Sequence, residues 1–155
     1  MAANGFKWQY NLSGGKPLML SLIMKDTETL TVGDMLNLES GEVDLCATGD
    51  TSILGTFAAP ENPNDSVDGK PGTLSGTDST TKVKVIVNPD AVYADDNDTS
   101  ARAVGATLDI SGATGAQTLA ASSNTEFVVI ERKEQSTDPT LVMICSSAHA
   151  FAKAQ

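Results

Sequence analysis

His149 is the only histidine of this 155-residue chain, and the hydroxyl groups of Ser146 and Ser147 lie just before it. A hydroxyl, an imidazole and a carboxylate are the groups of a nucleophilic triad, which is recognised by the geometry of its side chains. Neighbouring residues of a strand point to opposite faces, and the chain has no Gly-x-Ser-x-Gly turn to expose a serine. The sequence therefore predicts that the protein is not an enzyme.

Cys46 and Cys145 are the only cysteines, and they do not form a Cys-x-x-Cys pair. A structural zinc site takes four Cys or His ligands, and two cysteines with one histidine do not make that set. We expect both thiols to be buried as small apolar groups. A disulfide between them stays open, because it depends on whether their strands are neighbours.

The run Asp95-Asp96-Asn97-Asp98 offers the hard oxygen ligands that Ca²⁺ prefers. It lacks the spacing of an EF-hand loop, with no glycine at the sixth position and no glutamate at the twelfth. Because charge clusters are usually exposed, we interpret this run as a solvated loop. No feature selects two carboxylates for glycoside hydrolysis, and no glycine-rich phosphate motif is present. The sequence predicts neither a metal nor a cofactor.

Short apolar runs between glycine-containing corners are the elements that must position these residues. Two such runs cover 30–38 and 53–57, with corners at Gly33-Asp34 and Gly49-Asp50. This pattern is typical of short strands in a compact β-body. We therefore expect an all-β protein whose body is a small β-barrel, a β-tulip-like fold or a sandwich.

Further strands are expected along the rest of the chain. They cover residues 18–26, 43–47, 83–87, 91–93, 104–110, 126–131 and 140–145. Turn-forming residues at 39–42 and 88–90 separate some of these strands, and 132–139 is the expected hairpin loop between the last two. The tail, 148–155, is open between a short helix and an extended segment. Together, residues 18–155 make a single β domain.

Residues 1–17 are interpreted as an extended N-terminal arm. Phe6, Trp8 and Tyr10 alternate with polar residues, which places three of the seven aromatic residues on one face of a strand. These side chains have to be buried somewhere. One alternative is an edge strand folded back on the protein's own body, and the other is an arm laid across a neighbouring subunit.

Residues 58–80 are interpreted as a long loop inserted in the domain. They contain few large apolar side chains and cannot order themselves by packing alone. Loops of this length without structure of their own are usually functional or disordered. The alternatives are a surface loop and a loop ordered by a partner.

The formal charge of the chain is -10, and 13 of its 20 acidic residues are Asp. Such a surface repels phosphates and anionic lipids, so we expect no nucleic acid and no membrane partner. The longest apolar stretch, 18–24, is too short to span a bilayer, and the N-terminus has no signal pattern. We therefore expect the protein to be made in a cytoplasm.

The corners and strands between about residues 30 and 145 resemble the head-decoration, or cement, proteins of tailed bacteriophages. The residues that carry this resemblance are Gly33-Asp34, Gly41-Glu42-Val43, Gly49-Asp50, Ile53-Leu54-Gly55-Thr56, Val83 to Val87, Val92-Tyr93, Val104 to Ile110 and Glu126 to Ile130. The resemblance implies a small β-body, often trimeric, that docks on the capsid surface at local threefold positions. It implies the major capsid protein and further copies of this chain as partners, and the virion as the location.

The arm is the expected partner-binding segment under this resemblance, with Phe6, Lys7, Trp8, Tyr10 and Lys16 as its candidate residues. Two other classes remain open. One is a different phage structural protein, such as a tail-tube, neck or head-fibre base protein. The other is a carbohydrate-binding β-module, for which only Trp8, Tyr10 and Tyr93 would offer aromatic faces.

Overall fold

The computed structural model describes residues 5–62, 73–75, 80–121, 124–131, 135 and 137–152. No helix occurs among these residues, so the prediction of an all-β protein is confirmed. The strands are β1 (Phe6–Asn11), β2 (Met19–Ile23), β3 (Thr29–Thr31), β4 (Met35–Glu39), β5 (Glu42–Leu45), β6 (Ile53–Pro60), β7 (Thr73–Ser75), β8 (Lys82–Ile86), β9 (Ala91–Asp95), β10 (Thr107–Ser111), β11 (Thr118–Ala121), β12 (Phe127–Glu131) and β13 (Thr140–Ile144).

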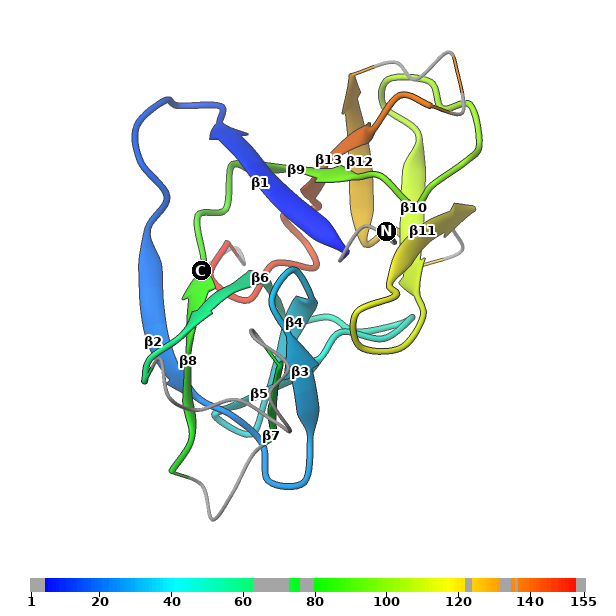
Figure 1. Ribbon diagram of the computed structural model, residues 1–155. Coiled ribbons are helices and arrows are strands. Elements are labelled where there is room, and N and C mark those ends of the chain that lie inside the picture. Colours follow the sequence, from blue (N-terminus) through cyan, green and yellow to red (C-terminus); the bar gives the residue numbers. More distant parts are fainter. Residues whose placement is uncertain are drawn as a thin grey trace.

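Two antiparallel sheets make up the body. One has the order β1-β9-β13-β12-β10-β11 and the other the order β2-β8-β6-β4-β5, while β3 and β7 form a separate pair. Figure 1 shows the six-stranded sheet in the upper half and the five-stranded sheet in the lower half. Neither sheet closes into a barrel, so the body is sandwich-like.

Alternation of apolar and polar residues explains why these segments form strands. In β8, Val83 and Val85 are fully buried while Lys82 and Lys84 are exposed, which is the period of two of a strand with one buried face. The predicted turn between β4 and β5 has Ser40 at φ 51° and Gly41 at φ 85°. Two successive positive φ values match a two-residue hairpin turn, for which glycine is well suited.

Two apolar cores result from this arrangement. The first is built by both sheets and includes Phe6, Met35, Ile53, Ile86, Tyr93, Ile110, Phe127, Val142 and Ile144. The second belongs to the five-stranded sheet and β3, and includes Met24, Leu30, Leu36, Val43, Leu54, Phe57, Val83 and Val85. Gly55 in β6 leaves no room for a side chain, because a Cβ there would come within 1.8 Å of the Ile86 carbonyl oxygen.

The structure corrects several predicted boundaries. β6 continues through Pro60, so the expected insertion at 58–80 begins later than predicted. Within it, β7 pairs with β3 of the same chain, and residues 63–72 and 76–79 lie outside the described residues. The described part of the tail, to residue 152, is a series of turns in which His149 bridges Ile53.

Candidate docking site

β1 is an edge strand of the protein's own six-stranded sheet, paired with β9. Its first residue, Phe6, is 2% exposed and stacks on Phe127 with ring centroids 5.9 Å apart. The amide of Phe6 also donates a hydrogen bond to the Gly33 carbonyl oxygen at 2.8 Å. Of the two alternatives for the arm, this arrangement is the edge strand. Phe6 therefore contributes to the core rather than to a surface.

A recess of about 380 Å³ runs beside β1, on the side of the five-stranded sheet. Trp8 lines it half-buried, and its indole nitrogen donates a hydrogen bond to Asn11 Oδ1 at 3.0 Å. Lys7 lies at the same recess but is exposed, and its ammonium pairs with Asp96 at 3.1 Å. The rest of the lining is mostly apolar and includes Val32, Phe57 and Ile86.

Tyr10 does not share a face with Trp8, contrary to the expectation from alternation. Trp8 pairs with Tyr93 and Tyr10 pairs with Val92, so Gln9 is the extra residue of a β-bulge. Because the bulge shifts the side-chain period by one, Tyr10 turns to the outer face of the sheet. There it is 36% exposed and donates a hydrogen bond from its hydroxyl to Glu131 at 3.3 Å.

The connection from β1 to β2 is held against the predicted turn at 88–90. The amide of Leu12 donates to the Asp90 carbonyl oxygen at 3.0 Å, and the amide of Val87 donates to the Leu18 carbonyl oxygen at 3.0 Å. Asn11 Nδ2 donates a hydrogen bond to the Lys16 carbonyl oxygen at 3.2 Å, and the Lys16 side chain is exposed. Lys16 and the exposed ends of the connection thus lie next to the start of β2.

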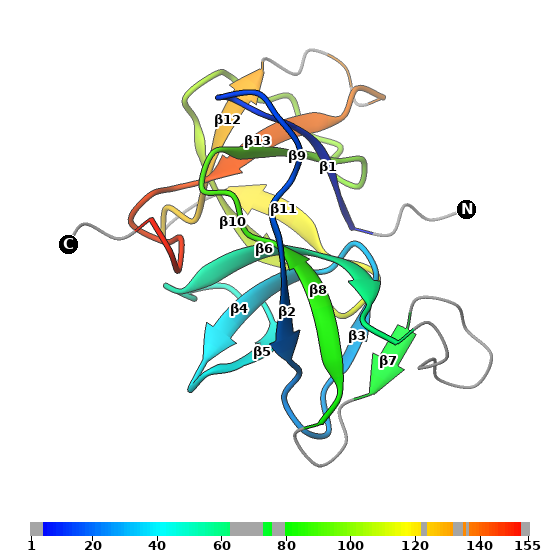
Figure 2. The same ribbon diagram turned by 90° about the vertical axis from the view of Figure 1, so that its left-hand side faces the viewer.

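β2 presents the most apolar exposed segment among the described residues. Leu18, Met19 and Leu20 are 56%, 46% and 37% exposed, and Leu12, in the connection that precedes β2, is 55% exposed. β2 is the outer strand of its sheet, and Figure 2 shows it at the front of the molecule. Exposed apolar edge strands favour pairing with other chains.

Basic residues accompany this apolar strand. Ser21 pairs with Lys84 and Ile23 pairs with Lys82, so these side chains share the outer face of the sheet. We call this surface the β2 face; it consists of Met19, Ser21, Ile23, Lys82 and Lys84. Leu20 pairs with the buried Val85, so it points to the opposite side and is exposed at the edge of the sheet. Lys82 and Lys84 were not among the residues predicted to bind a partner, although their alternation with Val83 and Val85 indicates that they point outward.

The residues of the supposed triad are not assembled around a nucleophile. His149 is fully buried, and its Nδ1 accepts a hydrogen bond from the amide of Phe151 at 3.0 Å. Burial lowers the pKa of His149 to about 4, with a backbone hydrogen bond to Leu54 acting in the opposite direction. Ser146 and Ser147 are exposed. His149 therefore acts as a neutral core residue that attaches the tail to β6.

Both cysteines are free thiols. Cys46 is buried in the first core, and Cys145 is partly buried against it. Burial raises the pKa of both thiols, which keeps them protonated and unreactive at neutral pH.

The acidic run at 95–98 is not the solvated loop that we expected. Asp95 is 0% exposed and Asp98 is 3% exposed. Asp95 accepts hydrogen bonds from the amides of Asn97 (2.8 Å) and Leu119 (2.9 Å), and burial raises its pKa. Burial alone would raise the pKa of Asp98 too, but hydrogen bonds from Arg102, among others, lower it overall. These carboxylates turn inward because they bind groups of their own chain.

Other buried polar side chains join distant segments in the same way. Asp34 accepts hydrogen bonds from the amides of Thr31 (2.8 Å) and Gly115 (2.7 Å). Gln117 accepts one from the amide of Met35 at 2.6 Å and donates to the Cys46 carbonyl oxygen at 2.9 Å. These side chains thus hold the loop between β10 and β11 against the five-stranded sheet.

The described residues hold no helix of the length and apolarity that a membrane crossing requires. Comparisons of the chain with known protein families, with characterised proteins and with solved structures gave no match. Among the described residues, the β2 face is the best candidate for a docking site.

Proposed function

We propose that this protein is a structural virion protein that binds the outer surface of a tailed-phage capsid and stabilises the shell. The observation that carries the proposal is the β2 face, where the exposed Met19 lies on the same side of the sheet as Lys82 and Lys84, next to the apolar edge residues Leu18 and Leu20. Such a surface favours another protein as its partner, because strand addition supplies backbone hydrogen bonds while apolar side chains fill matching pockets.

The charge of the β2 face differs from that of the whole molecule. The chain carries a formal charge of -10, whereas this face carries the two exposed lysines Lys82 and Lys84 and one exposed carboxylate, that of Glu61, which accepts a hydrogen bond from Ser21 at 2.6 Å. Local positive charge offsets the repulsion that an acidic protein meets at an acidic shell, and complementary charges accelerate association. The capsid surface under the β2 face is therefore expected to carry carboxylates.

Stabilisation follows from mass action. A protein that binds the assembled shell more tightly than its separated subunits shifts the equilibrium toward the intact shell. We propose the major capsid protein as the partner and a homotrimer at local threefold positions as the bound form. In this proposal three copies of the β2 face contact the shell together, so weak individual contacts add to a high combined affinity.

Co-sedimentation with empty shells, assembled from the major capsid protein of the same phage, tests the proposal. We expect the wild-type protein to saturate the shells at three copies per local threefold position. A double variant, Lys82→Glu with Lys84→Glu, should bind at least about tenfold more weakly, because like charges then face each other. Lys7→Glu, on the other sheet, is the matched control and should bind normally.

Two results would contradict the proposal. Absence of wild-type protein from the shell pellet would exclude capsid binding, and equal binding of the double variant would exclude the β2 face. Stacked rings of the isolated protein in electron micrographs would instead support a tail-tube protein.

A further inference from the structure

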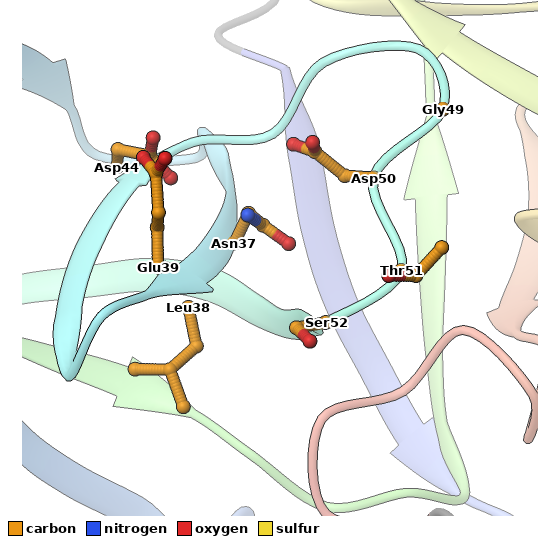
Figure 3. A pocket seen from close by; sticks show the side chains of 8 residues that line it. All are labelled: Asn37, Leu38, Glu39, Asp44, Gly49, Asp50, Thr51 and Ser52. Atoms are coloured by element: carbon orange, nitrogen blue, oxygen red, sulfur yellow. The ribbon is translucent and has the colours of Figure 1, made fainter.

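A polar pocket of about 270 Å³ opens between the β4–β5 hairpin and the segment that leads into β6. Its lining includes Asn37, Glu39, Asp44, Gly49, Asp50 and Ser52. Figure 3 shows the carboxylates of Asp44 and Glu39 on one side, that of Asp50 on the other side, and the Asn37 amide between them. This pocket is separate from the β2 face.

The pocket carries an excess of negative charge. Lys25 is the one basic side chain paired there among the described residues, and its ammonium lies 2.6 Å from Glu39 and 3.6 Å from Asp44. Three carboxylates against one ammonium leave the pocket negative. Burial, as the main cause, and a hydrogen bond shared with Glu39, as the second, raise the pKa of Asp44 to about 6. The negative charge of ionised Asp44 is therefore not fully balanced by the groups around it.

Two buried acceptor atoms point to a missing donor. Asn37 is 8% exposed, and its Oδ1 atom has no hydrogen-bond donor among the described residues. The Oδ1 atom of Asp44 is likewise buried without a donor in this part of the chain. A buried acceptor without a donor lowers the stability of a fold, so a ligand that donates several hydrogen bonds would be bound favourably here.

The spacing of the acceptors selects the class of ligand. No group of three or more His, Cys, Asp or Glu side chains in the described residues converges closely enough to hold a metal ion. A guanidinium group is larger than a metal ion and carries five N–H donors in one plane, which reach acceptors on different sides. It also pairs well with carboxylates, through two parallel hydrogen bonds.

We propose that this pocket binds a guanidinium group, held between the carboxylates of Asp44 and Asp50, with the side-chain Oδ1 atom of Asn37 as a further acceptor. The guanidinium belongs either to an arginine side chain of a polypeptide or to a free guanidine compound. Lys25 stays on Glu39, on the outer side of the pocket, and leaves the inner acceptors for the ligand.

Titrations of the ¹⁵N-labelled full-length protein, followed by NMR, test this proposal. The probes are agmatine, the peptide acetyl-Gly-Arg-Gly-amide, the matching lysine peptide and CaCl₂. We expect agmatine or the arginine peptide to shift the amide signals of Gly49 and Thr51 and the side-chain amide of Asn37. The lysine peptide and CaCl₂ should bind at least about fivefold more weakly, because neither presents a planar fork of donors.

Two variants locate the site. Asp50→Asn keeps a side-chain oxygen for the hydrogen bond that Asp50 accepts from the amide of Ala47 at 2.8 Å, so the loop should stay folded. Asn37→Leu removes the buried acceptor. Each should raise the dissociation constant of the guanidinium probe at least about fivefold, since charge-assisted hydrogen bonds are among the strong ones. Glu61→Gln, an exposed carboxylate outside the pocket, is the matched control for the loss of one charge.

The outcomes separate the sources of the ligand. Binding of the arginine peptide assigns the pocket to an arginine of a polypeptide, and binding of agmatine alone assigns it to a free guanidine compound. The proposal is overturned if neither probe shifts these signals, if Ca²⁺ or the lysine peptide binds as tightly, or if Asp50→Asn and Glu61→Gln weaken binding equally.

Discussion

A buried imidazole, such as that of His149, makes the stability of a protein depend on pH in a direction that can be worked out. The folded protein holds His149 neutral with a pKa of about 4, whereas the unfolded chain has the ordinary value of 6.5. As the pH falls below about 6.5, the unfolded chain takes up a proton that the folded protein does not. His149 therefore favours folding at neutral pH, and this contribution is lost as the pH falls toward 4.

Replacement of His149 by Gln tests this sign. Between about pH 7.5 and about pH 5, His149 should lower the free energy of unfolding by about 2 kcal/mol in the wild type and not in the variant. Urea unfolding of both proteins at the two pH values measures the difference. The carboxylates contribute equally to the pH dependence of both proteins, so their contribution cancels in the comparison. This includes Asp44, whose raised pKa makes the folded protein more stable as the pH falls, opposite to the effect of His149. The same pH dependence in both proteins would show that His149 is accessible to protons in the fold.

Single residues also show why part of the structure was not predictable. The inward turn of Asp95 and Asp98 was not predictable, because each carboxylate has, besides its local partners, a buried partner from a distant segment. The Asp95 carboxylate meets the amide of Leu119, and the Asp98 carboxylate meets the hydroxyl of Thr140 at 2.7 Å. An aspartate in a loop is expected to be exposed, unless the fold places buried N–H or O–H donors next to its carboxylate. The polar pocket was missed for the same reason.

Among the elements, β1 is where the structure changes the expectation most. Its Phe6 side chain is part of the core, so we expect Phe6→Ala to lower the free energy of unfolding by about 3–5 kcal/mol. Tyr10→Ala, on the outer face of the same strand, should cost less than about 1 kcal/mol. Chemical denaturation of the two variants provides the measurement. Similar small losses would mean that β1 detaches from β9 in solution, as an arm exchanged between subunits would.

Strands with clear alternation were predictable, and short or irregular ones were not. The pair β12–β13 and the turn before β5 follow from apolar runs and turn residues, and the structure has both. β11 and β7 are short, with four and three residues, and their stability comes from pairing with β10 and β3. The strand expected from Val104 begins at Thr107, because Val104 and Gly105 form a turn. The bulge at Gln9 was not predictable from the sequence either, since it depends on how β1 pairs with β9.

At the scale of the whole molecule, the surface divides by charge and polarity. The β2 face places the exposed Met19 on the same side as Lys82 and Lys84, on a chain whose formal charge is -10. The sequence contained these residues, but their gathering depends on the pairing of β2 with β8, which are far apart along the chain. A protein with this distribution of charge is expected to bind its partner in one orientation, with the β2 face toward the partner and the acidic remainder toward solvent.

The release of DNA on heating tests the proposed stabilising role most directly. Phage particles that lack the protein are compared with the same particles after the purified protein is added back, and DNA release is followed by the fluorescence of a DNA-binding dye. We predict that the restored particles release their DNA at a higher temperature, because binding favours the intact shell. Restoration with the Lys82→Glu, Lys84→Glu double variant should give a smaller increase. Equal release temperatures for bare particles and for particles fully occupied by the wild-type protein would contradict the account.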